Sequence, residues 1–137
     1  MIVDTSALIA ILLDEEGSEA MIRALASETA RLPSPARVEF MRVASGARLN
    51  LASKAEALLV ECAACGMETI AFTAHQADLA SRANGRFGKG NGRGGALNVL
   101  DLMVYAAAMD RDEPLLFTGG DFATTDVTCH PASRQSG

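Results

Sequence analysis

The chain has 137 residues, of which 49% are hydrophobic and 21% are charged, and its formal net charge is −5. This length supports one domain with one hydrophobic core, and the balance of apolar and charged residues excludes a disordered chain. No apolar run reaches the ~18 residues that a membrane-spanning helix needs, and no basic segment precedes the first apolar stretch, so we expect a cytoplasmic protein without a signal peptide.

The N-terminal part predicts one strand followed by three helices. The strand is expected at residues 1–3, and the spacing of apolar residues predicts helices over residues 6–15 and 15–28, with a break near Gly17. Two prolines punctuate the next segment. There, Ser34 is a candidate N-cap with Pro35 at the first helical position of a third helix.

The middle of the chain predicts a helix and then a strand. Residues 53–65 are amphipathic, Gly66 is a natural C-cap, and residues 67–72 have the apolar pattern of a strand. Cys62 and Cys65 form a C-x-x-C near the end of this helix. Because they have neither the ligand spacing of a zinc site nor the position of a redox motif, we interpret both as small buried residues.

A glycine-rich basic segment follows the next predicted helix. That helix begins at residue 74, with Thr73 and Gln76 in capping-box spacing, and residues 86–95, RFGKGNGRGG, predict a loop. The basic side chains in this region are Arg82, Arg86, Lys89 and Arg93. Glycines let backbone N–H groups approach phosphates and cations neutralise them, which favours a phosphate-binding loop over a dinucleotide site; a solvated flexible loop is the alternative. Phe87 is either a stacking platform for a base or a packing anchor.

The C-terminal part predicts a helix over residues 98–110, a buried strand over residues 114–118 and a turn-like segment after it. Strands and helices therefore alternate along the chain, which predicts an α/β fold with a mainly parallel central sheet flanked by helices. We expect one domain over residues 1–130 and a loose C-terminal tail over residues 131–137.

Four carboxylates lie at positions that suit a shared metal site. Asp4 ends the first strand and Asp121 follows the last, and ligands of parallel sheets bind beyond the carboxyl ends of strands. Asp101 and Glu39 each stand between apolar neighbours on predicted helices. Buried carboxylates placed together repel one another, and a divalent cation removes that repulsion. Oxygen ligands favour Mg²⁺ or Mn²⁺, and such a site supports attack of water on a phosphodiester.

Each of these acids also has a simpler interpretation. Asp4 could cap the first helix, Glu39 could be a first-turn acid near the helix dipole, and Asp121 could cap a short turn. Asp126 is best explained as an ordinary turn residue. Asp101 is the hardest to explain in this way, because its neighbours are apolar on both sides.

Three stretches resemble the PIN-domain ribonucleases, specifically the VapC-type toxins of type II toxin–antitoxin modules. They are MIVDTSALIAILLDE, PARVEFMRV and ALNVLDLMVYAAAMDRDEPLLFTGGDFATTDV, and the resemblance covers nearly the whole chain. It implies a single PIN-like domain that cleaves RNA with Mg²⁺ or Mn²⁺, binds a VapB-type antitoxin and forms a homodimer.

The resemblance also implies a role for individual residues. The catalytic acids would be Asp4, Glu39, Asp101 and Asp121, with Asp4 and Asp101 as the main metal ligands. Ser6 and Thr118 would support them with hydroxyl groups, and the cations at positions 82, 86, 89 and 93 would bind RNA.

The sequence departs from the family pattern beside two of the acids. Leu100 and Leu102 are bulkier than the residues usually found around the third Asp, and Gly120 replaces a common Asn before the fourth. A catalytically silent PIN-like domain that binds RNA or a protein is therefore the alternative. A haloacid-dehalogenase-like phosphatase would need an Asp where Ser6 stands, which disfavours that reading.

Overall fold

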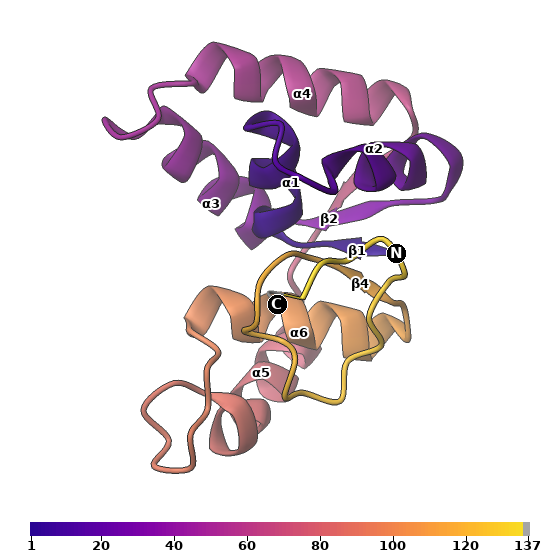
Figure 1. Ribbon diagram of the computed structural model, residues 1–137. Helices are drawn as coiled ribbons and strands as arrows, with labels where there is room; N and C mark the ends of the chain where they lie inside the picture. Colours follow the sequence, from indigo (N-terminus) through magenta and orange to yellow (C-terminus); the bar gives the residue numbers. More distant parts are fainter. Residues whose placement is uncertain (136–137) are drawn as a thin grey trace.

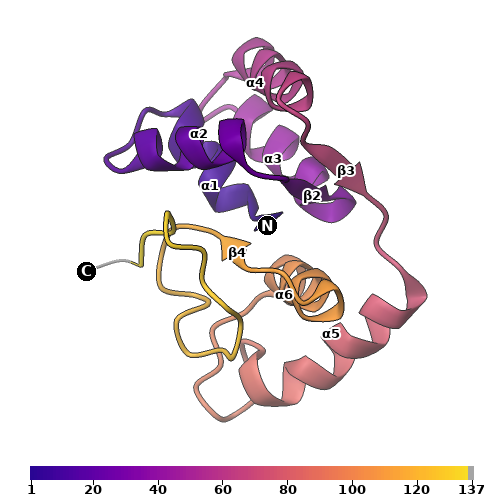
Figure 2. The same ribbon diagram turned by 90° about the vertical axis from the view of Figure 1, so that its right-hand side faces the viewer.

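The computed structural model describes residues 1–135, in which short strands alternate with helices around one sheet. The elements in chain order are β1 (Ile2–Val3), α1 (Thr5–Leu12), α2 (Ser18–Ser27), β2 (Arg31–Pro33), α3 (Ser34–Ser45), α4 (Ala52–Ala64), β3 (Glu68–Ile70), α5 (Ala74–Phe87), α6 (Val99–Arg111) and β4 (Leu115–Leu116). The sheet order is β3-β2-β1-β4 and every pair is parallel. Figures 1 and 2 show α1 to α4 on one side of the sheet, and α5 and α6 on the other. The predicted α/β fold with a parallel sheet is confirmed.

The central strands lie at the heart of the hydrophobic core. Ile2, Val3, Leu115 and Leu116 have no exposed surface, as expected for parallel strands that are covered on both faces. No helix within residues 1–135 combines the length and the hydrophobicity that a membrane span requires.

Several local signals in the sequence are confirmed. Gly17 separates α1 from α2 with a φ of 89°, a left-handed conformation that glycine adopts without strain. In the capping box of α5, the Gln76 N–H donates to Thr73 Oγ1 at 3.1 Å, and the Thr73 N–H donates to Gln76 Oε1 at 3.2 Å. Ser34 is not the N-cap of α3, however, because it is already the first helical residue and Pro33 occupies the cap.

Two elements differ from the sequence prediction. Strand β2 was not predicted, because its prolines suggested punctuation; buried Leu32 nevertheless pairs with Thr69 of β3, and Pro33 stands at the strand end. Helix α5 continues to Phe87, so Arg86 lies on a helix rather than in the predicted loop. Burial of the Phe87 ring, 5.4 Å from that of Tyr105, stabilises this extra turn.

The cysteines have different environments. Cys62 is buried on α4, whereas Cys65 is exposed, and all three cysteines are free. The interpretation of the pair as two buried residues is therefore wrong for Cys65, which follows the last helical residue.

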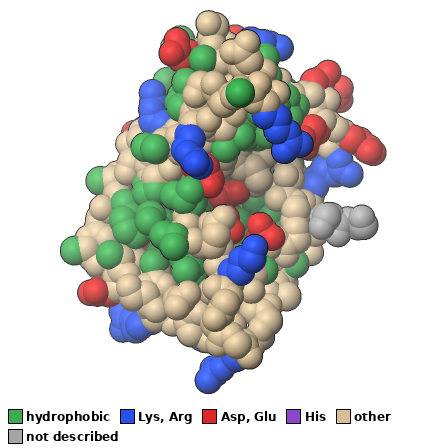
Figure 3. All heavy atoms as spheres, turned by 90° about the vertical axis from the view of Figure 1, so that its left-hand side faces the viewer, with side chains coloured by type: hydrophobic (Ala, Val, Ile, Leu, Met, Phe, Trp, Pro, Cys, Tyr) green, Lys and Arg blue, Asp and Glu red, His purple; other side chains and the backbone are tan. Residues whose placement is uncertain are grey.

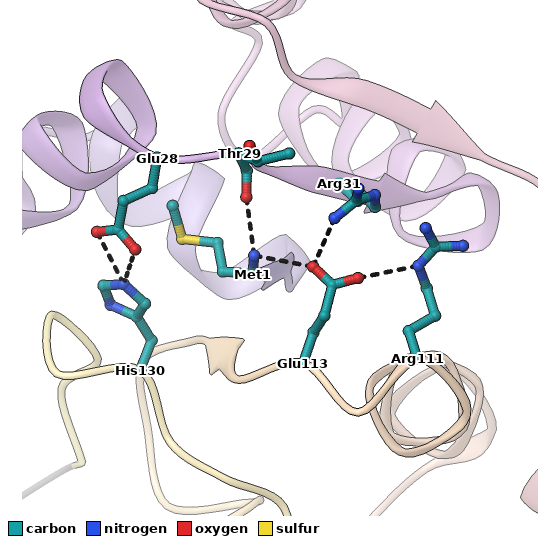
Figure 4. Close-up of polar contacts among 7 residues, drawn as sticks. All are labelled: Met1, Glu28, Thr29, Arg31, Arg111, Glu113 and His130. Carbon is teal, nitrogen blue, oxygen red and sulfur yellow. Dashed lines mark hydrogen bonds and ion pairs between the residues drawn. The ribbon is translucent and has the colours of Figure 1, made fainter.

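The edge of the sheet where the strands begin is closed by ionic contacts around Glu113 (Figure 4). Its Oε1 accepts hydrogen bonds from the Met1 ammonium group at 3.1 Å and from Arg31 at 2.7 Å, and its Oε2 accepts one from Arg111 at 3.0 Å. Burial alone would raise the pKa of Glu113, but these hydrogen bonds and charges lower it. This edge is thus held together by ion pairs, whereas Asp4 lies at the opposite edge, where β1 ends.

The C-terminal segment is hydrogen-bonded to β4 over its described part. The Ser133 hydroxyl donates to the Leu115 carbonyl at 2.9 Å, and the Arg134 N–H donates to the Phe117 carbonyl at 3.0 Å. Buried His130 lies 2.9 Å from a Glu28 carboxylate oxygen (Figure 4). Ser133 and Arg134 of the predicted tail therefore make hydrogen bonds to the rest of the fold, the division of the chain at residue 130 stays a prediction, and residues 136–137 lie outside the described residues.

Candidate active site

Asp4 combines a capping role with an unused oxygen. It is 4% exposed, and its Oδ2 accepts hydrogen bonds from the Ser6 N–H at 3.0 Å and from the Ser6 hydroxyl at 2.6 Å. This carboxylate therefore caps α1, as the simpler interpretation held. Its Oδ1, in contrast, is buried without a hydrogen-bond partner. Such an atom is costly unless something binds it, and a cation would do so.

Ser6 links the ends of the two central strands. Its hydroxyl donates to Asp4 and accepts a hydrogen bond from the Thr118 N–H at 3.0 Å. Ser6 thus holds the carboxylate in one orientation, and its supporting role in catalysis stays a prediction. Thr118 makes this contact through its backbone N–H, whereas we had expected its hydroxyl to contribute.

Asp101 is fixed at the start of α6 by a second capping box. Its Oδ2 accepts a hydrogen bond from the Asn98 N–H at 3.1 Å, and its own N–H donates to Asn98 Oδ1 at 2.8 Å. The side chain is only 8% exposed. The Asn-x-x-Asp spacing was readable in the sequence, but Asn98 was not identified there as the residue that positions this acid.

The four predicted acids influence one another electrostatically. Burial raises the pKa of Asp4 to about 6 against the hydrogen bonds from Ser6, and the charge of Glu39 adds to the rise. Burial raises the pKa of Asp101 to about 7 against the hydrogen bond from Asn98, and the charges of Asp4, Asp121 and Glu39 raise it further. Glu39 is half-buried and Asp121 is exposed. The face of the molecule drawn in Figure 3 has acidic side chains in a hollow near its centre and basic side chains at the margin of that hollow.

The acids approach one another without forming a finished metal site. Within residues 1–135, no group of three or more Asp, Glu, His or Cys side chains stands in an arrangement that holds a metal ion. Over the same residues, none of the ion pairs involves Asp4, Glu39, Asp101 or Asp121. The donor set, with the free Asp4 Oδ1 and two raised pKa values, fits a hard divalent cation.

The four predicted RNA-binding cations lie on the last turns of α5 and in the loop that follows it. Arg82 and Arg86 lie on α5, Lys89 and Arg93 lie in the loop that follows, and all four are exposed. The loop is closed by the Leu97 N–H, which donates to the Phe87 carbonyl at 2.9 Å. Inside it, Asn91 Oδ1 accepts hydrogen bonds from the N–H groups of Arg93 at 2.7 Å and Gly95 at 3.2 Å. The backbone of this loop is therefore defined by its own hydrogen bonds.

We expect Gly95→Ala to open this loop. A Cβ at position 95 would lie 2.6 Å from the carbonyl atoms of Phe87 and would also overlap the Gly88 carbonyl oxygen. Because these are backbone atoms, the closing hydrogen bonds must give way, at a cost of about 1 to 3 kcal/mol. Urea denaturation measures the loss, and faster amide hydrogen exchange at Leu97 locates it.

Gly85→Ala is the matched control for that substitution. Gly85 is an exposed helical residue, and a Cβ there meets nothing within 4 Å. The change should stabilise α5 by about 0.5 to 1 kcal/mol. Equal effects of the two substitutions would contradict the assignment of Gly95 as a site of close backbone approach.

Comparison with known proteins identifies the class to which this fold and this acidic edge belong. Residues 1–127 match the family described as PIN domain, and the chain belongs to that family. Among its relatives, ribonuclease VapC28 of Mycobacterium tuberculosis is 43% identical over 128 residues, which cover 93% of this chain and 95% of VapC28. Ribonuclease VapC of Mycolicibacterium smegmatis is 38% identical over 127 residues, 93% of this chain and 97% of that protein. The resemblance to VapC ribonucleases is thus confirmed, and membership among these nucleases implies a divalent metal.

Solved structures agree with this fold at low sequence identity. VapC20 of Mycobacterium tuberculosis, described as a sarcin-ricin-loop-cleaving toxin, superposes with a TM-score of 0.69 and 18% identity, covering 93% of this chain and 95% of that one. A toxin–antitoxin complex from Klebsiella pneumoniae gives a TM-score of 0.68 and 16% identity, covering 95% and 96%. These two similarities establish the fold of the chain.

Proposed function

We propose that this protein is a metal-dependent endoribonuclease, the toxin of a VapBC-type pair, which cleaves RNA phosphodiesters at the acidic edge of its sheet. The observation that carries the proposal is Asp4, whose buried Oδ1 lacks a partner beside a second buried acid, Asp101. The sequence identity of 43% to a ribonuclease VapC over almost the whole chain supports the same reaction.

The residues of this site have different roles. Asp4 and Asp101 hold the cation, Mg²⁺ or alternatively Mn²⁺, and Glu39 and Asp121 complete its surroundings directly or through water. When bound, the cation would stabilise the negative charge on the leaving oxygen and would lower the pKa of an attacking water. Ser6 and Asn98 orient the two main ligands, and Arg82, Arg86, Lys89 and Arg93 attract the RNA backbone.

Two protein partners complete the proposal. Relatives and structural neighbours are named as VapC ribonucleases and VapBC or toxin–antitoxin complexes, which supports a VapB-type antitoxin as the partner of this chain in the cytoplasm. A homodimer is supported by exposed apolar side chains on α3 and α4, where Val38 is 68% and Val60 is 70% exposed.

We expect the purified protein to cut single-stranded RNA when Mg²⁺ or Mn²⁺ is present and to stop when EDTA is added. The reason is that a bound cation is needed to lower the pKa of the attacking water and to stabilise the negative charge on the leaving oxygen. Gel analysis of a labelled RNA, with mapping of the cleaved ends, measures the reaction. RNA cleavage at full rate in EDTA would refute the metal-dependent mechanism.

A catalytically silent PIN-like domain is the second candidate. It is favoured by the lack of a finished metal group among residues 1–135 and by the bulky Leu100 and Leu102 beside Asp101. Calorimetric titration with Mn²⁺ separates the two candidates. The nuclease proposal requires binding at millimolar or lower concentrations, whereas absence of binding together with intact RNA would establish the silent domain.

A further inference from the structure

Asp126 joins three elements beside the acidic site. Its Oδ1 accepts the hydrogen bond of the Tyr105 hydroxyl at 2.5 Å, and its Oδ2 lies 3.6 Å from Nη1 of Arg86. The Arg86 guanidinium carbon lies 4.5 Å from the centre of the Phe87 ring, which in turn lies 5.4 Å from the Tyr105 ring. The guanidinium is therefore held between a carboxylate and an aromatic face.

This cluster lies next to the carboxylates that would hold the metal. Tyr105 follows Asp101 by four residues on α6, so the two side chains share one face of the helix, about 6 Å apart along its axis. Asp126 belongs to the same segment after β4 as Asp121. Arg86 is in the last turn of α5, directly before the glycine-rich loop. Arg86 is thus the last basic residue of α5 before the loop, and its partner Asp126 is bonded to the residue one helical turn after Asp101.

The two contacts of Asp126 differ in strength. The hydrogen bond from Tyr105 is short and its donor is 5% exposed. The contact with Arg86 is long, and the side chains are 62% and 43% exposed, so it adds little to the stability of the fold. A phosphate offers a guanidinium two charge-assisted hydrogen bonds. Arg86 can therefore leave Asp126 for a phosphate while Tyr105 keeps Asp126 in place.

We propose that Arg86 is the phosphate-binding residue beside the acids, and that Asp126 is a positioning residue which holds its guanidinium ready until an RNA phosphate takes over. That the bound phosphate belongs to RNA rests on the proposed function. It singles out Arg86 among the four basic residues of the region, since Arg86 alone has its guanidinium both paired with a carboxylate and stacked on a ring within residues 1–135.

The test measures binding of a short fluorescent single-stranded RNA by anisotropy in EDTA, where no cleavage disturbs the equilibrium. Arg86→Gln should weaken binding about tenfold and reduce the slope of log K against log salt by about 0.7, the value for one lost contact with a single strand. Arg23→Gln, an exposed arginine on α2, is the control and should change neither quantity. An unchanged salt slope in Arg86→Gln would overturn the proposal.

A double-mutant cycle separates positioning from a general structural role. Asp126→Asn keeps an acceptor for Tyr105 but removes the charge that holds Arg86, so it should weaken binding about threefold through the cost of ordering a free side chain. In the Arg86→Gln background it should not weaken binding, because nothing remains to be held and one repelling charge is gone. Equal weakening in both backgrounds would overturn the positioning role.

The same variants distinguish this inference from the proposed function. With Mg²⁺, Arg86→Gln should raise KM about tenfold and leave kcat within about twofold, because it removes binding rather than metal chemistry. If the protein binds RNA through Arg86 but does not cut it, the inference stands and the nuclease proposal falls. If the protein shows no salt-dependent RNA binding, both fall.

Discussion

Replacing Asp101 by Asn should abolish RNA cleavage and, at pH 8 without metal, make the protein more stable. The cleavage rate should fall at least ~10²-fold, the loss typical of removing one group that stabilises charge in a transition state. The fold should survive, because the amide oxygen of Asn can still accept the hydrogen bond from Asn98 that the carboxylate accepts now. Single-turnover cleavage of a labelled RNA measures the first effect.

The gain in stability follows from the environment of Asp101. Its side chain is 8% exposed, and burial together with the charges of three other acids raises its pKa to about 7. At pH 8 the folded protein must therefore carry a charge that its surroundings disfavour. Removing that charge should stabilise the fold by about 1 to 2 kcal/mol, less than the full pKa shift implies, because solvent screens part of the repulsion. Urea denaturation in EDTA measures this change.

Asp78→Asn is the matched control for Asp101→Asn. Asp78 is an exposed residue of α5, and its charge is not among those that raise the pKa of Asp4 or Asp101. The same loss of charge there should leave cleavage unchanged and shift stability by less than about 0.5 kcal/mol. If Asp101→Asn cleaves RNA as fast as this control does, Asp101 is not a ligand of the catalytic metal.

The positions of the acids were predictable because they follow strand ends and helix starts, which the sequence marks clearly. Apolar Ile2 and Val3 fix the first strand, so the place of Asp4 at its carboxyl end follows directly. What could not be predicted was how Asp4 divides its two oxygens between a helix cap and a free position. That division depends on the Ser6 rotamer and on the Thr118 N–H, which lies just after β4 and 112 residues after Ser6 in the chain.

Elements governed by tertiary packing were harder to predict than those governed by local signals. The local pattern placed Arg86 in a flexible loop, but a distant aromatic residue, Tyr105, makes it favourable for α5 to continue to Phe87. Asp126 was interpreted as an ordinary turn acid for the same reason, since its two partners come from α5 and α6. The length of α5 and the partners of Asp126 were thus both out of reach of the sequence, because these contacts join residues far apart in the chain.

Without divalent metal, the free energy of unfolding should decrease as the pH rises from about 5 to 8. The pKa values of Asp4 and Asp101 are raised to about 6 and about 7 in the folded protein, so between pH 4 and 7 the folded state binds more protons than the unfolded state. The stability that these neutral acids contribute is complete below pH 4 and is lost as the pH passes through 6 and 7. The total loss is on the order of 3 kcal/mol after allowance for solvent screening.

Mg²⁺ or Mn²⁺ should weaken this dependence, because a cation binds the ionised acids that destabilise the metal-free protein. At pH 8, an ion at ten times its Kd should restore about 1.4 kcal/mol, whereas at pH 5 protons occupy the same oxygens and the ion should have little effect. Urea titrations at pH 5, 6, 7 and 8, with EDTA or with metal, measure both trends, and Asp101→Asn should flatten them. If metal stabilises the protein equally at pH 5 and pH 8, the ion is bound elsewhere, and the raised pKa values of Asp4 and Asp101 do not report a cation site.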